Sequence, residues 1–211
     1  MQTFKFEELS ERAKEKAREW YAQNTDDYWA EPIIEHAKEE GLTLGFSIED
    51  ILWAGFYSQG DGASWHGRVD VKKFLEHHLT PDNTHFGRYT VLAELVDNGC
   101  VDEKFTVYIR SFMYKHSGMM RAEGPASYSG PERILDRGIL AGANYEDLYE
   151  SIGIDDMLER LTAWALDEAK SYADDIYKRL EKEYDYEISD EHIQETADIN
   201  GWRFSEDGTF Q

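Results

Sequence analysis

The chain has 211 residues, 41% of them apolar and 14% aromatic, which is enough material for the core of a globular protein. Its 44 acids and 22 bases give a net charge of −22, which disfavours direct binding to nucleic acid or to an anionic membrane. No stretch reaches the roughly 18 apolar residues of a membrane span, and the single cysteine, Cys100, can form neither an internal disulfide nor a cysteine-rich zinc site. Because no linker-like segment divides the chain, we expect one domain over residues 1–211. The single cysteine fits a reducing compartment, so we expect the protein in the cytoplasm.

The negative charge is distributed unevenly along the chain. Residues 1–50 carry a net charge of −7, residues 51–140 carry −1 and residues 141–211 carry −14. Such an excess of acids either serves solubility alone or attracts a basic protein partner, and both interpretations stay open.

Two helices are predicted near the N-terminus. Ser10 is a typical N-cap for the segment ERAKEKAREWYAQ, whose apolar residues recur at helical spacing and whose charges are unlike the apolar core of a signal peptide. A second helix is expected over residues 28–40 and is expected to end at Gly41, with Pro32 in its first turn or at a kink.

From residue 48 the apolar pattern becomes alternating, and the stretch FYSQGDGASWHG follows. Asp61 and Gly62 tolerate positive φ and can form a two-residue turn, which predicts a hairpin over residues 48–71 with Ala54 opposite Val69. In this register one face is almost entirely apolar, as a half-buried strand pair requires. That face carries Leu52, Ala54, Phe56, Trp65, Val69 and Val71.

The opposite face of this hairpin mixes aromatic rings with hydrogen-bonding groups and is suited to a planar ligand or a peptide. In the predicted register it carries Trp53, Tyr57, Gln59, Ser64, His66, Arg68 and Asp70. The turn accounts for the glycines, so no phosphate or metal is needed to explain them. The ligand-binding candidates are Trp53, Tyr57, Ser58, Gln59, Asp61, Ser64, His66, Arg68, Tyr114 and His116.

The rest of the chain predicts mostly helices and two further hairpins. In order these are a helix through 72–78, a hairpin over 104–123, helical pieces around 132–140, a long amphipathic helix over 154–184, a helix between Ser189 and Gly201, and a terminal hairpin around Asp207 and Gly208. Residues 89–96 fit a helix and a strand equally. We expect an α+β fold, in which an antiparallel sheet of hairpins packs against N-terminal helices and the long C-terminal helix. The apolar strand face is expected to meet Trp20, Leu161, Trp164 and Tyr172.

The common catalytic and cofactor motifs do not occur in the sequence. It contains no His-x-x-x-His, no Gly-x-Ser-x-Gly and no Gly-x-x-x-x-Gly-Lys. His77 and His78 are adjacent, and adjacent residues on a helix point about 100° apart, so the two do not share a metal. A metal held by Asp61, His66 and His85 is a weaker alternative, and no cofactor is expected.

The acids that follow residue 145 are candidates for a partner-binding surface. Full imitation of DNA along the predicted long helix, ~45 Å, would need about 26 negative charges, whereas residues 155–184 hold nine acids and five bases. Several of these charges pair at i,i+4, as Asp156 does with Arg160. The remaining acids are the partner-binding candidates: Glu146, Asp147, Glu150, Glu183, Asp185, Glu187, Asp190, Glu191, Glu195 and Asp198.

Three stretches resemble a family of bacteriophage and prophage proteins: FYSQGDGAS at 56–64, YKHSGM at 114–119 and SDEHIQETADINGWRFSEDG at 189–208. The N-terminal FEELSERAKEKAREWY is also similar, so the resemblance spans nearly the whole chain. Some members carry the label of an antitoxin of a toxin-antitoxin stability system. The resemblance implies a phage-encoded accessory protein acting in the host cytoplasm, and it assigns no catalytic role to the motif residues. The chain departs from the family pattern at Trp65, His66, Trp202 and Arg203.

Charge and resemblance together favour a non-enzymatic accessory protein. We expect it to bind and inhibit a basic, nucleic-acid-handling host or defence protein, as a partial DNA mimic or in the manner of an antitoxin. The first alternative is a protein that binds or sequesters a nucleotide-like small molecule on the polar hairpin face. The second is an enzyme of unknown class at the same face. No direct nucleic-acid partner and no membrane is expected, and the oligomeric state stays open.

Overall fold

The computed structural model describes residues 2–80, 106–111, 115–124 and 154–211, of which 154–158 are described by their backbone alone. These residues form two compact units, one from Met1–Ile33 with Lys178–Gln211 and the other from Ile34–Tyr177. The fold is α+β, as predicted. The expected elements around 89–96 and 132–140 lie outside the described residues. None of the helices in the described part of the chain combines the length and the apolar character that a membrane span requires.

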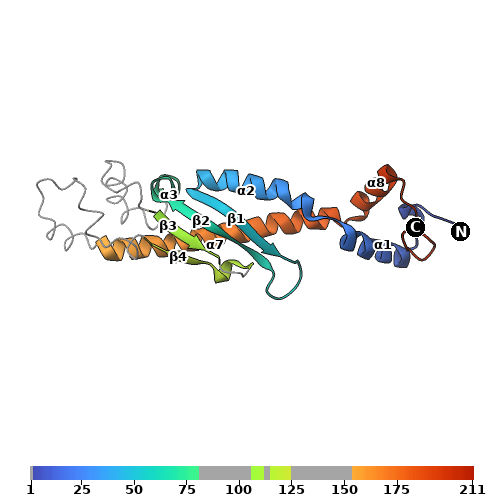
Figure 1. Cartoon of the computed structure of the whole chain (residues 1–211), viewed down its shortest axis with the longest axis horizontal. Coiled ribbons are helices and arrows are strands. Elements are labelled where there is room, and N and C mark those ends of the chain that lie inside the picture. Colours follow the sequence, from blue (N-terminus) through green and yellow to red (C-terminus); the bar gives the residue numbers. More distant parts are fainter. Residues whose placement is uncertain (1, 81–105, 112–114, 125–153) are drawn as a thin grey trace, which may run out of the picture. The chain divides into compact units, whose positions relative to one another are not determined.

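An antiparallel four-stranded sheet is the centre of the unit Ile34–Tyr177 (Figure 1). Its strands lie in the order β1 (Phe46–Ala54), β2 (Gly62–Asp70), β3 (Thr106–Arg110) and β4 (Arg121–Glu123). Each strand pairs with its neighbour in the chain, so the hairpins predicted over residues 48–71 and 104–123 are both present. A 3-10 turn, η3 (Ser117–Met119), precedes β4 at the predicted turn.

The predicted register of the first hairpin is wrong. Ala54 pairs with Gly62, and Val69 pairs with Phe46 instead of Ala54. The connection is therefore a loop of residues 55–61, not a two-residue turn. The observed register aligns Phe46 with Val69 on the buried side of the sheet, and burial of large side chains outweighs the local preference of an Asp-Gly pair for a tight turn.

One face of the sheet is buried against helices. Trp65, Val69 and Ile109 are fully buried on this face, and the Trp65 indole N–H donates to the carbonyl of Ala169 at 3.1 Å. Ala169 lies on α7 (Ile154–Glu187), the predicted long helix, which runs along the sheet in Figure 1. The buried indole thus satisfies its one donor on the backbone of the covering helix.

Two shorter helices complete this face, α2 (Glu31–Thr43) and α3 (Val71–His78). The Tyr172 hydroxyl of α7 donates to the carbonyl of Ala37 at 2.7 Å and joins α7 to α2. Gly41 does not end α2 as predicted, because the helix continues to Thr43. Gly41 is instead buried where a Cβ would lie 3.0 Å from Ile48 Cδ1, so the lack of a side chain lets β1 approach.

The other unit has its own core, built from both ends of the chain. It contains α1 (Glu11–Asn24) and α8 (Asp190–Asn200), with 3-10 turns η1 (Phe6–Glu8) and η2 (Asp27–Ala30). Ser10 caps α1 and Ser189 caps α8, as predicted. The buried core residues are Phe6, Leu9, Ala13, Ala17, Tyr21, Ile193, Ala197 and Phe204.

Aromatic stacking holds the chain ends in this unit. The ring of Trp20 stacks on Phe210 at 4.1 Å between centroids and meets the edge of Trp202 at 5.4 Å. Trp20 was expected in the core under the sheet, so that prediction is wrong. Phe204 forms isolated antiparallel β-bridges with Phe210, in the predicted terminal hairpin, and with Phe4.

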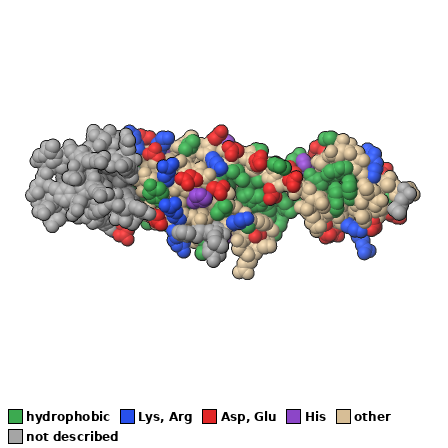
Figure 2. Space-filling model, viewed as in Figure 1, with side chains coloured by type: hydrophobic (Ala, Val, Ile, Leu, Met, Phe, Trp, Pro, Cys, Tyr) green, Lys and Arg blue, Asp and Glu red, His purple; other side chains and the backbone are tan. Residues whose placement is uncertain are grey.

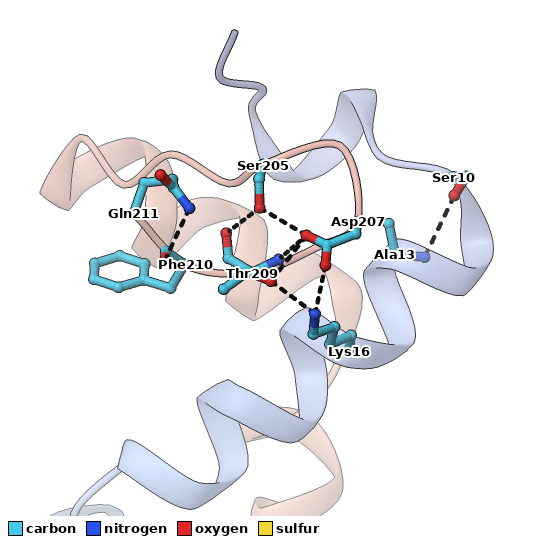
Figure 3. Close-up of polar contacts among 8 residues, drawn as sticks. All are labelled: Ser10, Ala13, Lys16, Ser205, Asp207, Thr209, Phe210 and Gln211. Carbon is cyan, nitrogen blue, oxygen red and sulfur yellow. Dashed lines mark hydrogen bonds and ion pairs between the residues drawn. The ribbon is translucent and has the colours of Figure 1, made fainter. Parts of the chain in front are cut away.

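The terminal hairpin packs tightly on α1 (Figure 3). The Asp207 carboxylate accepts hydrogen bonds from the Lys16 ammonium at 2.6 Å and from the Thr209 hydroxyl at 2.8 Å, and these hydrogen bonds hold its pKa well below the ordinary value. Gly208 has a left-handed φ of 87°, and a Cβ there would collide with the Ala13 carbonyl oxygen. Only glycine fits this contact.

Trp164 tests the buried face of the sheet. It is 5% exposed, and its ring lies 4.8 Å from Phe74. Trp164→Ala should lower the free energy of unfolding by ~3 to 5 kcal/mol, because it leaves a cavity in a close-packed core. Urea unfolding measures this change, and Tyr28→Ala, at a position 70% exposed, is the control with a change below about 0.5 kcal/mol. An unchanged urea midpoint for Trp164→Ala would contradict the packing.

Gly208 and Gly201 form a matched pair that tests the contact of the terminal hairpin with α1. Both have left-handed φ, but a Cβ at Gly201 meets nothing within 4 Å. Gly201→Ala should therefore cost only about 1 to 2 kcal/mol for the backbone conformation. Gly208→Ala should cost roughly a further 1 to 3 kcal/mol for the steric collision. Equal losses in thermal unfolding followed by tryptophan fluorescence would show that the hairpin does not press on α1.

Candidate functional site

The loop between β1 and β2, residues 55–61, contains most of the FYSQGDGAS motif. Asp61 closes this loop, because its carboxylate accepts the backbone N–H of Ser58 at 2.6 Å while its own N–H donates to the Ser58 carbonyl at 3.2 Å. A Cβ at Gly55 would lie 2.6 Å from an oxygen of the same carboxylate. The aspartate and the first glycine of the loop are thus needed for its shape.

A second set of contacts fixes the start of the loop. The ring of Phe56 stacks on Trp53, at 5.7 Å between centroids, and on Tyr177 of α7, at 5.5 Å. The Tyr177 hydroxyl also donates to the Gly55 carbonyl at 3.3 Å. The next residue, Tyr57, is 68% exposed and has a left-handed φ of 72°. The loop therefore turns one aromatic ring inward and the following one outward.

The remaining candidates of the first hairpin do not share one surface. Trp53 pairs with Ala63 and stacks on Phe56, so it lies on the helix-covered side and not on the polar face as predicted. His66 and Arg68 lie on the open face of β2. Ser64 is buried, with its hydroxyl oxygen 2.6 Å from that of Ser111. The planar-ligand site predicted from the sequence is thus divided among three places.

The two motif segments FYSQGDGAS and YKHSGM meet at Gly62. A Cβ at Gly62 would lie 3.0 Å from Cδ2 of His116 and 3.2 Å from the carbonyl oxygen of Lys115. His116 is held in turn by its Nδ1, which accepts the N–H of Gly118 at 2.9 Å. Gly62 therefore makes room for the second segment beside the loop. Tyr114, the other candidate from this segment, lies outside the described residues.

The open face of the sheet carries residues that the sequence reasoning missed. Arg68 lies opposite Tyr108, and Tyr108 opposite Glu123. The guanidinium of Arg110 lies 5.1 Å from the centre of the Tyr108 ring, with its Nε 3.4 Å from Glu123. The alternation of residues 105–110 signalled this face, because it places every second side chain of β3 away from the core. Figure 2 shows acids, bases and histidine mixed over this part of the molecule.

The acidic candidates near the C-terminus divide into paired and unpaired groups. Arg18 donates to both oxygens of Asp190, at 2.5 and 2.9 Å, and Lys5 lies 3.1 Å from Asp198. Glu187 lies 3.2 Å from the His192 ring. Asp185 also has a partner, whereas three acids form no ion pair with any residue the structure describes: Glu183, Glu191 and Glu195. The candidates Glu146, Asp147 and Glu150 lie outside the described residues.

The described residues do not place histidines in a metal site. They contain no group of three or more His, Cys, Asp or Glu side chains placed to hold a metal ion. His85, one of the three residues of the metal alternative, lies outside them. Burial lowers the pKa of His78, whose ring packs 4.4 Å from that of Phe74. That histidine is best explained as part of the core.

A family model described as "Domain of unknown function (DUF8835)" matches residues 29–190. The chain belongs to this family. No curated protein and no solved structure matches the chain.

The matched range contains the whole unit Ile34–Tyr177, including the loop of residues 55–61. Every residue of the core formed by the chain ends lies outside this range. The loop is thus part of the DUF8835 domain, whereas the aromatic cluster around Trp20 is not.

The Arg18–Asp190 pair predicts a pH dependence of stability. The side-chain hydrogen bond from Arg18 lowers the pKa of Asp190 below that of the unfolded chain. The stabilisation is therefore complete above about pH 4 and is lost as the pH falls through the lower, folded-state pKa. Asp190→Asn should lower the melting temperature by about 1 to 4 °C at neutral pH, since the pair is partly exposed. This difference from the wild type should shrink below about pH 4. Glu195→Gln is the control, and a difference that stayed constant with pH would contradict the assignment.

Proposed function

We propose that this DUF8835 protein is a non-enzymatic binding protein whose acidic surface engages a basic protein. The observation that carries the proposal is the net charge of −22, of which −14 belongs to residues 141–211. A field of this sign raises the rate at which a basic protein is encountered and repels nucleic acid itself. The resemblance to phage proteins supports a nucleic-acid-handling host or defence protein as the partner, inhibited by a partial DNA mimic or antitoxin-like protein.

The distribution of ion pairs supports a particular part of this surface. Asp190 and Asp198 form ion pairs with Arg18 and Lys5 of the same unit, which partly neutralise their charges. Glu183, Glu191 and Glu195 form no such pair within the described residues, so their carboxylates add fully to the outward field. Because the long helix holds nine acids and five bases over residues 155–184, the surface suits a basic protein better than it copies a duplex.

The small-molecule alternative draws less support from the geometry. Its aromatic and hydrogen-bonding residues are separated, with Trp53 under the sheet, Tyr57 on the loop and Arg68 on the open face. A compact ligand touches groups that converge. The enzyme alternative has no nucleophile and base assigned to it.

Salt and charge variants test the proposal. The full chain is immobilised and exposed to an extract of the cells that produce it, at about 50 mM and about 500 mM salt, where screening differs strongly. We expect a basic protein to be retained at low salt and released at high salt. The triple variant Glu183→Gln, Glu191→Gln, Glu195→Gln should reduce its association rate by about 10-fold, because rim charges act mainly on association.

A matched triple variant separates this surface from total charge. Glu31→Gln, Glu35→Gln and Glu39→Gln on α2 remove the same charge at other exposed positions. We expect their effect on the association rate to be less than about 3-fold. Retention that does not change with salt, or equal effects of the two triple variants, would reject the acidic surface near the C-terminus as the binding site.

A further inference from the structure

We propose that the tip of the β1–β2 loop, formed by Tyr57, Ser58 and Gln59, is a preformed protein-recognition element with Tyr57 as its aromatic anchor. The charge of the partner in this inference rests on the proposed function. The location of the contact does not, because it follows from the loop itself.

Tyr57 combines exposure with an unfavourable backbone conformation. Its side chain is 68% exposed, and it is the only residue other than glycine with a positive φ in the described part of the chain. An L residue with a bulky side chain rarely adopts this conformation, because its Cβ crowds the backbone. The Tyr57 ring lies 6.4 Å from that of Phe56, yet the side chain stays largely exposed on a backbone that glycine would fit better. Strain of this kind concentrates at binding sites.

The surrounding residues hold the tip in place. Phe56 stacks against Tyr177, the Tyr177 hydroxyl binds the Gly55 carbonyl, and Asp61 binds the backbone N–H of Ser58. These contacts join the loop to α7 on one side and close it on the other. A loop that is already ordered loses little conformational entropy on binding, so more of the contact energy appears as affinity.

The chemistry of the tip fits a protein partner. Tyrosine supplies a large amphipathic surface with few rotatable bonds, and Ser58 and Gln59 supply adaptable hydrogen bonds, the composition typical of antibody paratopes. Both polar residues are exposed, and a Cβ at the following Gly60 would meet nothing within 4 Å. The loop's only charged residue, Asp61, directs its carboxylate to the Ser58 N–H. The tip itself is therefore uncharged.

The acidic charge of the protein and the aromatic ring of Tyr57 together indicate which side chain of the partner contacts the tip. The partner's surface is rich in lysine and arginine if it is attracted by the net charge of −22. Such side chains bind the face of an exposed tyrosine through cation–π contact and stacking, and arginine does so most often. We therefore assign an arginine or lysine side chain of the partner to Tyr57.

Binding kinetics with the protein retained at low salt test the anchor. Tyr57→Ala should raise the dissociation rate by about 10-fold or more, as at interface hot spots, and leave the association rate within about 2-fold. Tyr57→Phe, which keeps the ring, should retain most of the affinity. Tyr28→Ala is the matched control, because Tyr28 is 70% exposed and has no left-handed backbone. An unchanged dissociation rate for Tyr57→Ala would overturn the anchor.

A stability measurement separates recognition from structure. Tyr57→Gly should melt close to the wild-type temperature, because the freedom of glycine to adopt the left-handed φ offsets the loss of the ring contact with Phe56, and it should still lose binding. A clear fall in the melting temperature would show that Tyr57 supports the fold instead.

Crosslinking decides the location even if no partner is retained through charge. A photoreactive benzoylphenylalanine is placed at position 57 or at position 28, and the cells producing the full chain are irradiated. We expect one discrete crosslinked protein from position 57 and none from position 28, and we expect the Asp61→Ala change, which opens the loop, to remove it. Equal products or no product at position 57 overturn the loop, whatever the salt test shows. A discrete product with an acidic protein leaves the loop standing and overturns the lysine or arginine assignment.

Discussion

Burial of one side of the β1–β2 hairpin against α7 determines most of the described sheet. Trp65 is completely buried, and its indole N–H is satisfied by the Ala169 carbonyl of the helix. A buried indole that lost this acceptor would leave its donor unsatisfied, so the position of the ring is tightly constrained. Side chains alternate along β2 and β3, and fixing Trp65 therefore fixes which of their residues face the helix and which face outward. On β1 a register shift between Ile48 and Asp50 changes the alternation, so that Ile51 and Phe46 are both buried. Val107 and Ile109 follow on β3, and Arg68 and Tyr108 are turned to the open face as a consequence.

The same constraint explains the shape of the motif loop. With Ile51 opposite Trp65, strand pairing stops at Ala54 and Gly62, and residues 55–61 have to connect two strand ends that lie close together. The chain solves this with left-handed residues, an inward Phe56 and a carboxylate that binds the loop backbone. Most of FYSQGDGAS is thereby assigned to structure. The tip differs from the rest because Tyr57 has a strained backbone and stays 68% exposed beside Phe56, so it carries more functional information than the glycines around it.

The sequence predicted the elements well and their long-range partners poorly. Caps at Ser10 and Ser189 and the periodicity of α7 are local signals, and the structure confirms them. The predicted register of the first hairpin was wrong because a turn rule considers only nearby residues. Which side chains of the strands face the core is decided by packing against α7, whose Ala169 lies 104 residues from Trp65 in the chain. Trp20 was misplaced for a similar reason: its partner Phe210 comes from the far end of the chain. The neutralisation of Asp190 by Arg18 depends on a contact of the same kind, so counting acids in the sequence overstates the free charge of that surface.

Charge and shape then have different consequences for recognition. A diffuse acidic field acts over a Debye length of about 8 to 10 Å and affects mainly how often a basic partner arrives. It does little to distinguish one basic protein from another, because many proteins share that sign of charge. Discrimination between partners needs a contact whose geometry is fixed before binding. A flexible contact can adapt to a wrong partner as readily as to the right one, so it does not distinguish their affinities. In the described residues, the tip at Tyr57 is an aromatic and exposed part of the surface whose backbone is held by its neighbours. If the acids bring the partner near, it is this neutral, rigid tip that has the means to choose it.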